Sequence, residues 1–486
     1  MLTAAAVALA FVGVRTAPEV RGGANLLVTG KGPEAIIDEN NSPATAVNPI
    51  DSNNVVTVNR VDRPRYSAIL HWSADGGGTW SDTALALPPG RDRPYAPDAA
   101  FAADGTLYVS YVNLEGVGND PQTLWLSRST DGGRSLSAPV QVAGRYSFQA
   151  RVVAGPGRQV HITWVRAASV GLLALNQPAP VVMATSNDGG ATFGAPVQVS
   201  DGSRTRVGAA TPIVDSSGAV EVLYEDFKGD ARDFDNLDGP PWDRPFALVL
   251  SRSTDNGTTF SPGVEVDSGL VPSERFLVYL PRFPSIAAGP DLALYVAWAD
   301  ARSGADQVNV RRSGDGGVSW GPRTPVTDGT TPESSSWLPK VSVAPNGRVD
   351  IVYLAGHRNH SDGLVGAHLA SSADEATTFR TTPVSSTSFD SRIGPLAGPP
   401  YLPPDLGAQL GLASSDSGAV ASWVDTRLGT AGNGRQDIFS AAVSISGTGL
   451  STTRWAAIIV LLALAAVQAL LAVVAGAGPR GRRMRG

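Results

Sequence analysis

An eight-residue pattern that recurs at a regular spacing constrains this 486-residue chain more than any other feature. The pattern has serine first, aspartate third, glycine or a substitute fifth, and an aromatic residue or leucine eighth, as in "SADGGGTW" at 73–80. Its aspartates are Asp75, Asp131, Asp188, Asp255, Asp315 and Asp374, so neighbouring copies are 56 to 67 residues apart. A period of this size indicates one fold built from repeated units rather than several unrelated domains.

Each repeat carries strand-like segments before the octet. Alternating apolar and β-branched residues, as in "GTLYVSYVN" and "GRVDIVYLA", predict strands, and the 54 glycines and 36 prolines suit tight turns. A seventh unit at 410–445 repeats the strand pattern without an octet. We therefore predict an all-β propeller over residues 24–445, with seven blades favoured over six. The "NLLVTG" segment at 25–30 would supply the outer strand that closes the ring.

The octet itself is turn chemistry. An aspartate in a tight turn accepts hydrogen bonds from the N–H groups that follow it, and the glycine two residues on adopts a positive φ that other residues resist. The final aromatic side chain is expected to pack between neighbouring sheets. The six aspartates are thus predicted to be structural, and the sixth turn, where Ala376 replaces the glycine, to be the most distorted.

The pattern resembles the Asp-box of sialidases and related bacterial neuraminidase repeat propellers, over about residues 42–445. Sialidases of that family have six blades, so a seventh unit is a departure. In a four-stranded antiparallel blade, the hairpin between the third and fourth strands opens at one end of the blade. The loops from the second strand to the third, and from one blade to the next, open at the other end. A functional site is therefore expected opposite the octets.

The resemblance implies a set of candidate site residues. Sialidases hold the carboxylate of their sugar with arginines and use a Tyr–Glu pair and an aspartate acid/base. Arg282 would take the place of the first arginine and Asp306 that of the acid/base, while Glu225 and Tyr401 are the acid and the phenol in loops at the expected end. The order departs from the family, because only two units follow the blade that carries Arg282.

Other features leave alternatives open. "Trp-x-Asp-x-Arg" occurs at 298–302 and again at 423–427, which favours a repeat consensus whose Asp–Arg pair braces a loop. The acidic segment 225–245 is either a Ca²⁺ site or a solvated lid. The chain has no cysteine, so thiolate metal sites and cysteine nucleophiles are excluded, and no cofactor or other metal is predicted.

Both ends of the chain carry membrane signals. Residues 455–475 form an uncharged apolar run of 21 residues, long enough as a helix to span the roughly 30 Å hydrocarbon core. The tail at 476–486 contains four arginines and no acid, which predicts a cytoplasmic C-terminus and an ectodomain outside the membrane. Residues 1–17 resemble a signal peptide, and residues 446–454 form a spacer before the membrane helix.

Two hypotheses for function follow. The first is a membrane-anchored, sialidase-like exo-glycosidase that acts on acidic sugars at a bacterial cell surface. The second is a non-catalytic propeller that binds a glycan or a surface protein in the same funnel, since a fold does not determine a function. The net charge of −6 argues against nucleic acid as a partner.

Overall fold

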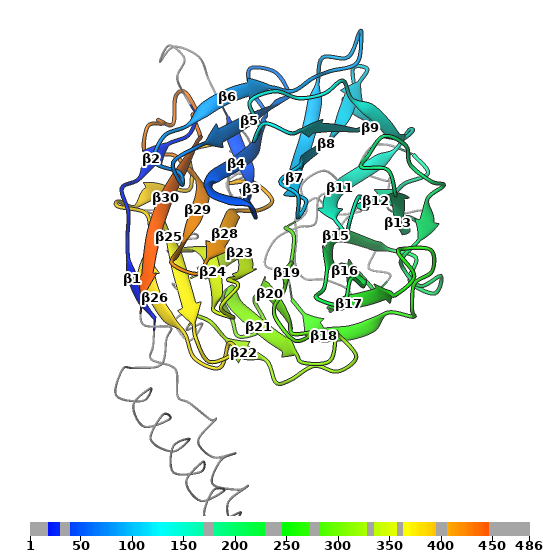
Figure 1. The fold of residues 1–486 in the computed structure, drawn as a ribbon. Coiled ribbons are helices and arrows are strands. Elements are labelled where there is room, and N and C mark those ends of the chain that lie inside the picture. Colours follow the sequence, from blue (N-terminus) through cyan, green and yellow to red (C-terminus); the bar gives the residue numbers. More distant parts are fainter. Residues whose placement is uncertain are drawn as a thin grey trace, which may run out of the picture.

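The computed structural model describes residues 18–29, 39–169, 178–228, 245–271, 282–327, 335–356, 363–394 and 406–446. In these residues the chain forms seven antiparallel sheets arranged as a ring (Figure 1), and we call the region along its central axis the channel. The predicted all-β class and the preference for seven blades are confirmed. The described residues contain strands, turns and bends, and no helix.

Six blades each follow one continuous stretch of chain, with the first strand at the channel and the fourth at the rim (Figure 1). Blade 1 consists of β3 (Asn40–Asn48), β4 (Asp51–Val61), β5 (Ser67–Ser73) and β6 (Ser81–Ala84). Blade 2 consists of β7 (Pro94–Phe101), β8 (Leu107–Glu115), β9 (Asp120–Ser129) and β10 (Val140–Ala143). Blade 3 consists of β11 (Ser147–Ala154), β12 (Val160–Arg166), β13 (Val181–Ser186) and β14 (Val197–Gln198). Blade 4 consists of β15 (Val207–Val214), β16 (Val220–Asp226), β17 (Phe246–Ser253) and β18 (Val264–Leu270). Blade 5 consists of β19 (Ser285–Ala288), β20 (Leu294–Asp300), β21 (Gln307–Ser313) and β22 (Thr324–Pro325). Blade 6 consists of β23 (Ser335–Val343), β24 (Val349–Gly356), β25 (Leu364–Ser372) and β26 (Arg380–Pro383), with β27 (Phe389–Asp390) beside β25.

Blade 7 joins the two ends of the propeller. Its inner strands are β28 (Gly411–Ser415), β29 (Gly418–Asp425) and β30 (Asp437–Ser446), and its outer strands are β1 (Glu19–Arg21) and β2 (Leu26–Leu27), both antiparallel to β30. Closure by the "NLLVTG" segment is therefore confirmed. Because β1 also pairs with β30, the sheet begins before residue 24, the predicted start of the propeller.

Neighbouring blades pack through the octets. Trp80, the last residue of the first octet, is buried, and its Nε1 donates a hydrogen bond to Ser440 Oγ of blade 7 at 3.0 Å. A Cβ at Gly133, in the second octet, would lie 3.3 Å from Val56 of blade 1. Each of these octets thus rests on the blade before it, which explains why a small residue and an aromatic residue occupy those positions.

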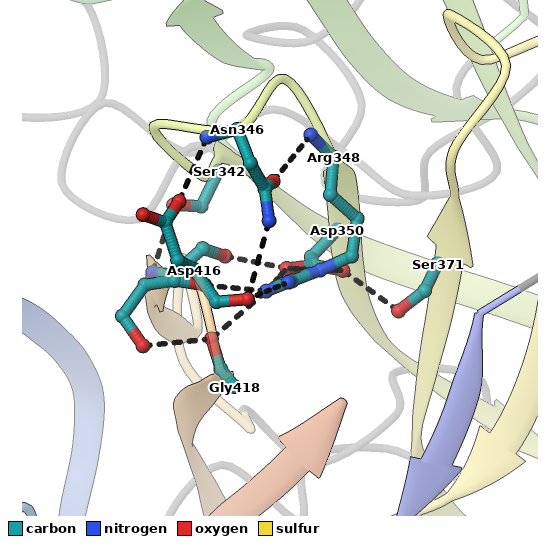
Figure 2. Close-up of polar contacts among 9 residues, drawn as sticks. Ser342, Asn346, Arg348, Asp350, Ser371, Asp416 and Gly418 are labelled. Carbon is teal, nitrogen blue, oxygen red and sulfur yellow. Dashed lines mark hydrogen bonds and ion pairs between the residues drawn. The ribbon is translucent and has the colours of Figure 1, made fainter. Parts of the chain in front are cut away.

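The interface between blades 6 and 7 is built differently, because blade 7 has no octet (Figure 2). The fully buried Arg348 forms an ion pair with Asp350 at 2.8 Å, and its guanidinium donates to the carbonyls of Ser415 and Gly418 at 2.8 and 2.9 Å. Ser371 and Ser414 donate to the Asp350 carboxylate at 2.7 and 2.8 Å. A satisfied buried ion pair therefore joins the last two blades.

Within the described part of the chain, no helix is long and apolar enough to cross a membrane. Ser446, the first residue of the predicted spacer, is the last residue of β30; the rest of the spacer, the predicted membrane helix, the basic tail and the signal-peptide-like segment at 1–17 lie outside the described residues.

Candidate ligand site at the mouth of the central channel

The six octets lie at one end of the blades, in the hairpins between third and fourth strands. In the second copy, Ser129 Oγ donates to Asp131 Oδ1 at 2.7 Å and accepts from the N–H of Gly133 at 2.9 Å. The N–H and hydroxyl of Ser135 donate to the two oxygens of the same carboxylate at 2.9 and 2.5 Å. These hydrogen bonds outweigh the opposing effect of burial and lower the pKa of Asp131 to about 2. Such carboxylates have their acceptor sites occupied.

The sixth octet, in which Ala376 replaces the glycine, keeps the hydrogen bonds of the other copies. Glu375 and Ala376 adopt φ values of 61° and 64°, the left-handed conformation that glycines, and Asn256 in the fourth copy, take in the other octets. The N–H of Ala376 still donates to Ser372 Oγ at 3.0 Å, and the N–H of Thr378 to Asp374 Oδ1 at 2.9 Å. The hydrogen bonds hold the turn in place despite the unfavourable φ of two non-glycine residues.

At the opposite end, which we call the channel mouth, the seven innermost strands begin. Five of them carry a β-bulge at an equivalent place, each with a non-glycine residue at a φ between 48° and 58°: Ser42, Ala96, Gln149, Ala209 and Leu338. Bulges of this kind redirect side chains and are common beside functional sites. The ring of bulges sets which side chains face the channel at its mouth.

Two cavities occupy the channel mouth. The larger, about 110 Å³, is lined by residues of blades 2 to 7, including Asp98, Arg151, Phe283, Lys340 and Gln409. The smaller, about 20 Å³, adds Ser42 and Arg60 of blade 1. Phe283 lines both cavities, and its N–H donates across the channel to Ala408 O of blade 7 at 3.2 Å. Together the cavities draw on all seven blades.

Three charged residues, Asp98, Arg151 and Lys340, line the larger cavity, on three different inner strands. Asp98 accepts a hydrogen bond from the N–H of Val152 at 2.9 Å, and its other oxygen lies 3.7 Å from Arg151 Nη1. The Arg151 guanidinium carbon lies 3.8 Å from the centre of the Phe283 ring, a cation–π contact. Burial lowers the pKa of both Arg151 and Lys340, and the nearby Asp98 opposes this effect.

The structure brings together two residues that the resemblance singled out. Arg282, directly before Phe283, lies with its Nη1 3.7 Å from Asp306 Oδ2, and the Asp306 side chain is 4% exposed. The Arg282 guanidinium also lies 6.0 Å from the ring centre of Trp337. Arg282 lines neither cavity, whereas Arg60 and Arg151 both line the smaller one.

A third candidate, Glu225, lines neither cavity. Glu225 was expected in a loop, but it is the penultimate residue of β16, with Gly208 and Leu248 as its register partners. The strand continues to Asp226, which pairs with Ala247. Burial raises the pKa of Glu225 to about 8. Tyr401 lies outside the described residues, as do residues 229–244 of the acidic segment.

The two "Trp-x-Asp-x-Arg" segments have the same local geometry. Trp298 Nε1 donates to Asp300 at 2.7 Å, and Arg302 Nε donates to the same carboxylate at 2.8 Å. In the second copy, Trp423 and Arg427 donate to Asp425 at 2.9 and 2.6 Å. In both copies, the arginine is held by its own loop rather than left available for a ligand. No group of three or more His, Cys, Asp or Glu side chains suited to a metal ion occurs among the described residues.

Sequence reasoning missed the cavity residues Asp98, Arg151, Lys340 and Phe283. A signal was available, because Pro43, Pro97, Pro284 and Pro339 stand at equivalent positions at the start of four inner strands. A proline repeated at one place in the unit marks a bulge or a strand beginning. The side chain one or two residues from it would then have been a candidate for the channel mouth.

Comparisons with known proteins assign neither a family nor an activity to this chain. No protein-family model matches the chain, and no curated protein matches it. Among solved structures, a protein of unknown function from Dyadobacter fermentans is 13% identical, with 88% of this chain and 99% of that chain covered and a TM-score of 0.48. A Hadza microbial sialidase is 17% identical, with 72% of this chain and 66% of that chain covered and a TM-score of 0.43. An ulvan lyase, a polysaccharide lyase, is 12% identical, with 84% of this chain and 95% of that chain covered and a TM-score of 0.49. Similarity at this level carries no activity over to this chain.

Proposed function

We propose that this protein is a sialidase-like, Asp-box β-propeller that binds a glycan at the channel mouth. The observation that carries the proposal is the pair of cavities opposite the octets, lined by side chains from all seven blades and bordered by Phe283. A concave site with an aromatic wall and a few convergent polar groups is typical of small-molecule recognition. A cavity of about 280 Å³ also lies at the octet end, lined in part by Arg128, Gly190 and Ala191, but no aromatic side chain is among its described lining residues.

Binding is favoured over hydrolysis by the state of the candidate catalytic groups. Asp306 is buried against Arg282, and Glu225 is a strand residue that lines neither cavity. A general acid has to come within hydrogen-bond reach of the bond it protonates. Glycan binding therefore has two alternatives: sialidase-type hydrolysis, and the binding of a protein ligand in the same funnel.

The proposal also includes the cellular location of the protein. The apolar run at 455–475 and the arginine-rich tail favour a single membrane span with the propeller outside the cytoplasm. Protease added to intact cells should digest the propeller and leave the C-terminal tail protected. Protection of the propeller in intact cells would overturn this part of the proposal.

Glycan binding is tested with the full chain in detergent on a panel of neutral and acidic glycans. Phe283→Ala should weaken binding about tenfold, because it removes the wall shared by both cavities, whereas Phe260→Ala at the octet end should leave affinity unchanged. Equal effects of the two variants, or no binding of any glycan, would contradict the proposal.

Hydrolysis is tested in parallel with a fluorogenic sialoside. The binding proposal predicts no release above background. Release that Arg282→Ala abolishes would instead establish the catalytic alternative, and release that Arg282→Ala leaves unchanged would remove Arg282 from the site.

A further inference from the structure

We propose that the octet end of the propeller faces the membrane and that the channel mouth opens away from it, toward ligands in solution or on a facing surface. This inference rests on the membrane location included in the proposed function, and goes beyond it by assigning which end of the propeller meets the lipid headgroups. A headgroup of the protein's own membrane is then excluded as the ligand of the channel mouth.

The first support is the end at which the chain leaves the propeller. In each blade that carries an octet, the first serine of the octet is the last residue of the third strand, as Ser129 is of β9. The third strands therefore run from the channel mouth to the octet end. β30 is the third strand of blade 7 and ends at Ser446. The N–H of Ile445 donates to Ser417 O at 2.9 Å, in the turn between β28 and β29. The chain thus leaves the propeller at the octet end.

The second support is that the chain enters the propeller at the same end. β1 lies beside β30 and is antiparallel to it, with Glu19 as the register partner of Ser446 (Figure 1). The described residues begin at Pro18, directly after the signal-peptide-like segment 1–17. Both apolar segments that the sequence predicts to meet a membrane are therefore joined to the propeller at its octet end.

The third support is the length of the connection to the predicted membrane helix. Residues 447–454 separate Ser446 from that helix, and a fully extended chain of this length reaches at most about 30 Å. β30 has ten residues and is itself roughly 30 Å long. With the mouth against the membrane, the connection would have to run the whole length of the blade. No chain would remain to pass the mouth loop at 426–436 and the headgroup layer, so the channel mouth cannot face the bilayer.

Energy transfer to membrane lipids tests the orientation. The chain has no cysteine, so single cysteines can be introduced at exposed apolar residues and labelled with a membrane-impermeant fluorescent maleimide. Ile50→Cys and Val318→Cys place the label at the octet end, whereas Val117→Cys and Leu428→Cys place it at the channel mouth. The full chain is inserted into phosphatidylcholine vesicles that contain a rhodamine-labelled lipid as the acceptor. Unchanged melting temperatures show that the variants are folded.

Energy transfer should be about twofold or more stronger from the octet-end labels than from the channel-mouth labels, because the two ends of a blade are roughly 30 Å apart. Ile50 and Leu428 are the matched pair, because they belong to blades 1 and 7, which are in contact through Thr45 and Ser422. Equal transfer from the two ends, or stronger transfer from the channel mouth, would overturn the proposed orientation.

A longer connection tests the physical reason for the orientation. An insertion of about twenty Gly and Ser residues within 447–454 lets the propeller turn over, since such a linker is flexible and can extend beyond the length of a blade. The twofold difference between the Ile50 and Leu428 labels should then be lost. A difference that persists in full would overturn the short connection as its cause.

The outcomes separate this inference from the proposed function. A chain that does not float with the vesicles in a density gradient would overturn the membrane location and this inference together. A chain that floats but shows the reverse order of energy transfer would overturn the orientation alone, and would leave the membrane location and glycan binding intact.

Discussion

The charged groups described at the octet end differ from two cations of the channel-mouth cavity in how far their hydrogen bonds are satisfied. At the octet end, each charged group described above has its hydrogen-bonding capacity filled, as with Asp131 in its turn and Arg348 between blades 6 and 7. At the channel mouth, Arg151 and Lys340 are desolvated and make no hydrogen bonds within the described residues. The charged groups described at the octet end therefore contribute to stability, whereas Arg151 and Lys340 at the channel mouth keep hydrogen-bond donors of the kind that a binding site uses.

The largest effect should come from breaking the buried ion pair at the octet end. Arg348→Ala leaves the Asp350 carboxylate buried without its cation, so the free energy of unfolding should fall by about 3–5 kcal/mol. Urea denaturation followed by tryptophan fluorescence measures the change. Arg392→Ala is the control, because Arg392 pairs with Asp390 at 2.7 Å but is 52% exposed, and it should cost less than about 1 kcal/mol. Similar losses in both variants would contradict the contrast.

A smaller effect should come from a single octet. Ser129→Ala removes the hydroxyl that bonds both Asp131 and the buried N–H of Gly133, and should destabilise the protein by about 1–2 kcal/mol. Thermal unfolding of the full chain measures this. Ser203→Ala, in an exposed interblade loop, should change stability by less than about 0.5 kcal/mol. If Ser129→Ala proved as mild as the control, the octet would not be a stabilising hairpin.

Glu225 offers a pH-dependent test away from the octets. Its folded-state pKa of about 8 lies above the ordinary 4.5, so between these values the folded protein keeps a proton that the unfolded chain releases. Stability should therefore fall as pH rises from 4.5 to 8. Glu225→Gln should remove this loss and gain about 1–2 kcal/mol over the wild type at pH 8, with little difference at pH 4.5. Parallel pH profiles for the two proteins would show that the carboxyl is not buried.

The smallest effect on stability is expected at the channel mouth. Lys340→Met removes a desolvated cation near Arg151, so the free energy of unfolding should stay within about 1 kcal/mol of the wild type and not decrease. The midpoint in urea at pH 7 is the measurement. A loss comparable to that of Arg348→Ala would mean that Lys340 is a structural residue, and the difference between the two ends would disappear.

Local patterns were the part of the fold that could be predicted. Seven units and their strands follow from alternation and spacing within each repeat, and the closure by Leu26 and Leu27 was inferred from the outer strand that the seventh unit lacks. The turn at Ala376 keeps its hydrogen bonds, which the preference for glycine alone does not reveal. Glu225 was placed in a loop because strand ends are poorly defined by alternation alone.

The candidate site was much harder to predict. Arg282 and Asp306 were chosen through a resemblance, and the structure places them in contact but outside the cavities. The cavity residues Arg151 and Lys340 belong to strands that look like any other inner strand. Pro339 marks the position of Lys340, but no neighbouring residue distinguishes Arg151 from an arginine held by its own loop, such as Arg302.

By itself, the sequence determined the repeat, its hairpins and the all-β class, because those depend on interactions within eight to about sixty residues of chain. Only the tertiary structure decided that Asp98, Arg151, Phe283 and Lys340 share one cavity. Their meeting depends on the closure of a seven-membered ring and on bulges that turn each inner strand at the channel mouth. Both are properties of how sheets pack around an axis, and no single segment of the sequence carries them.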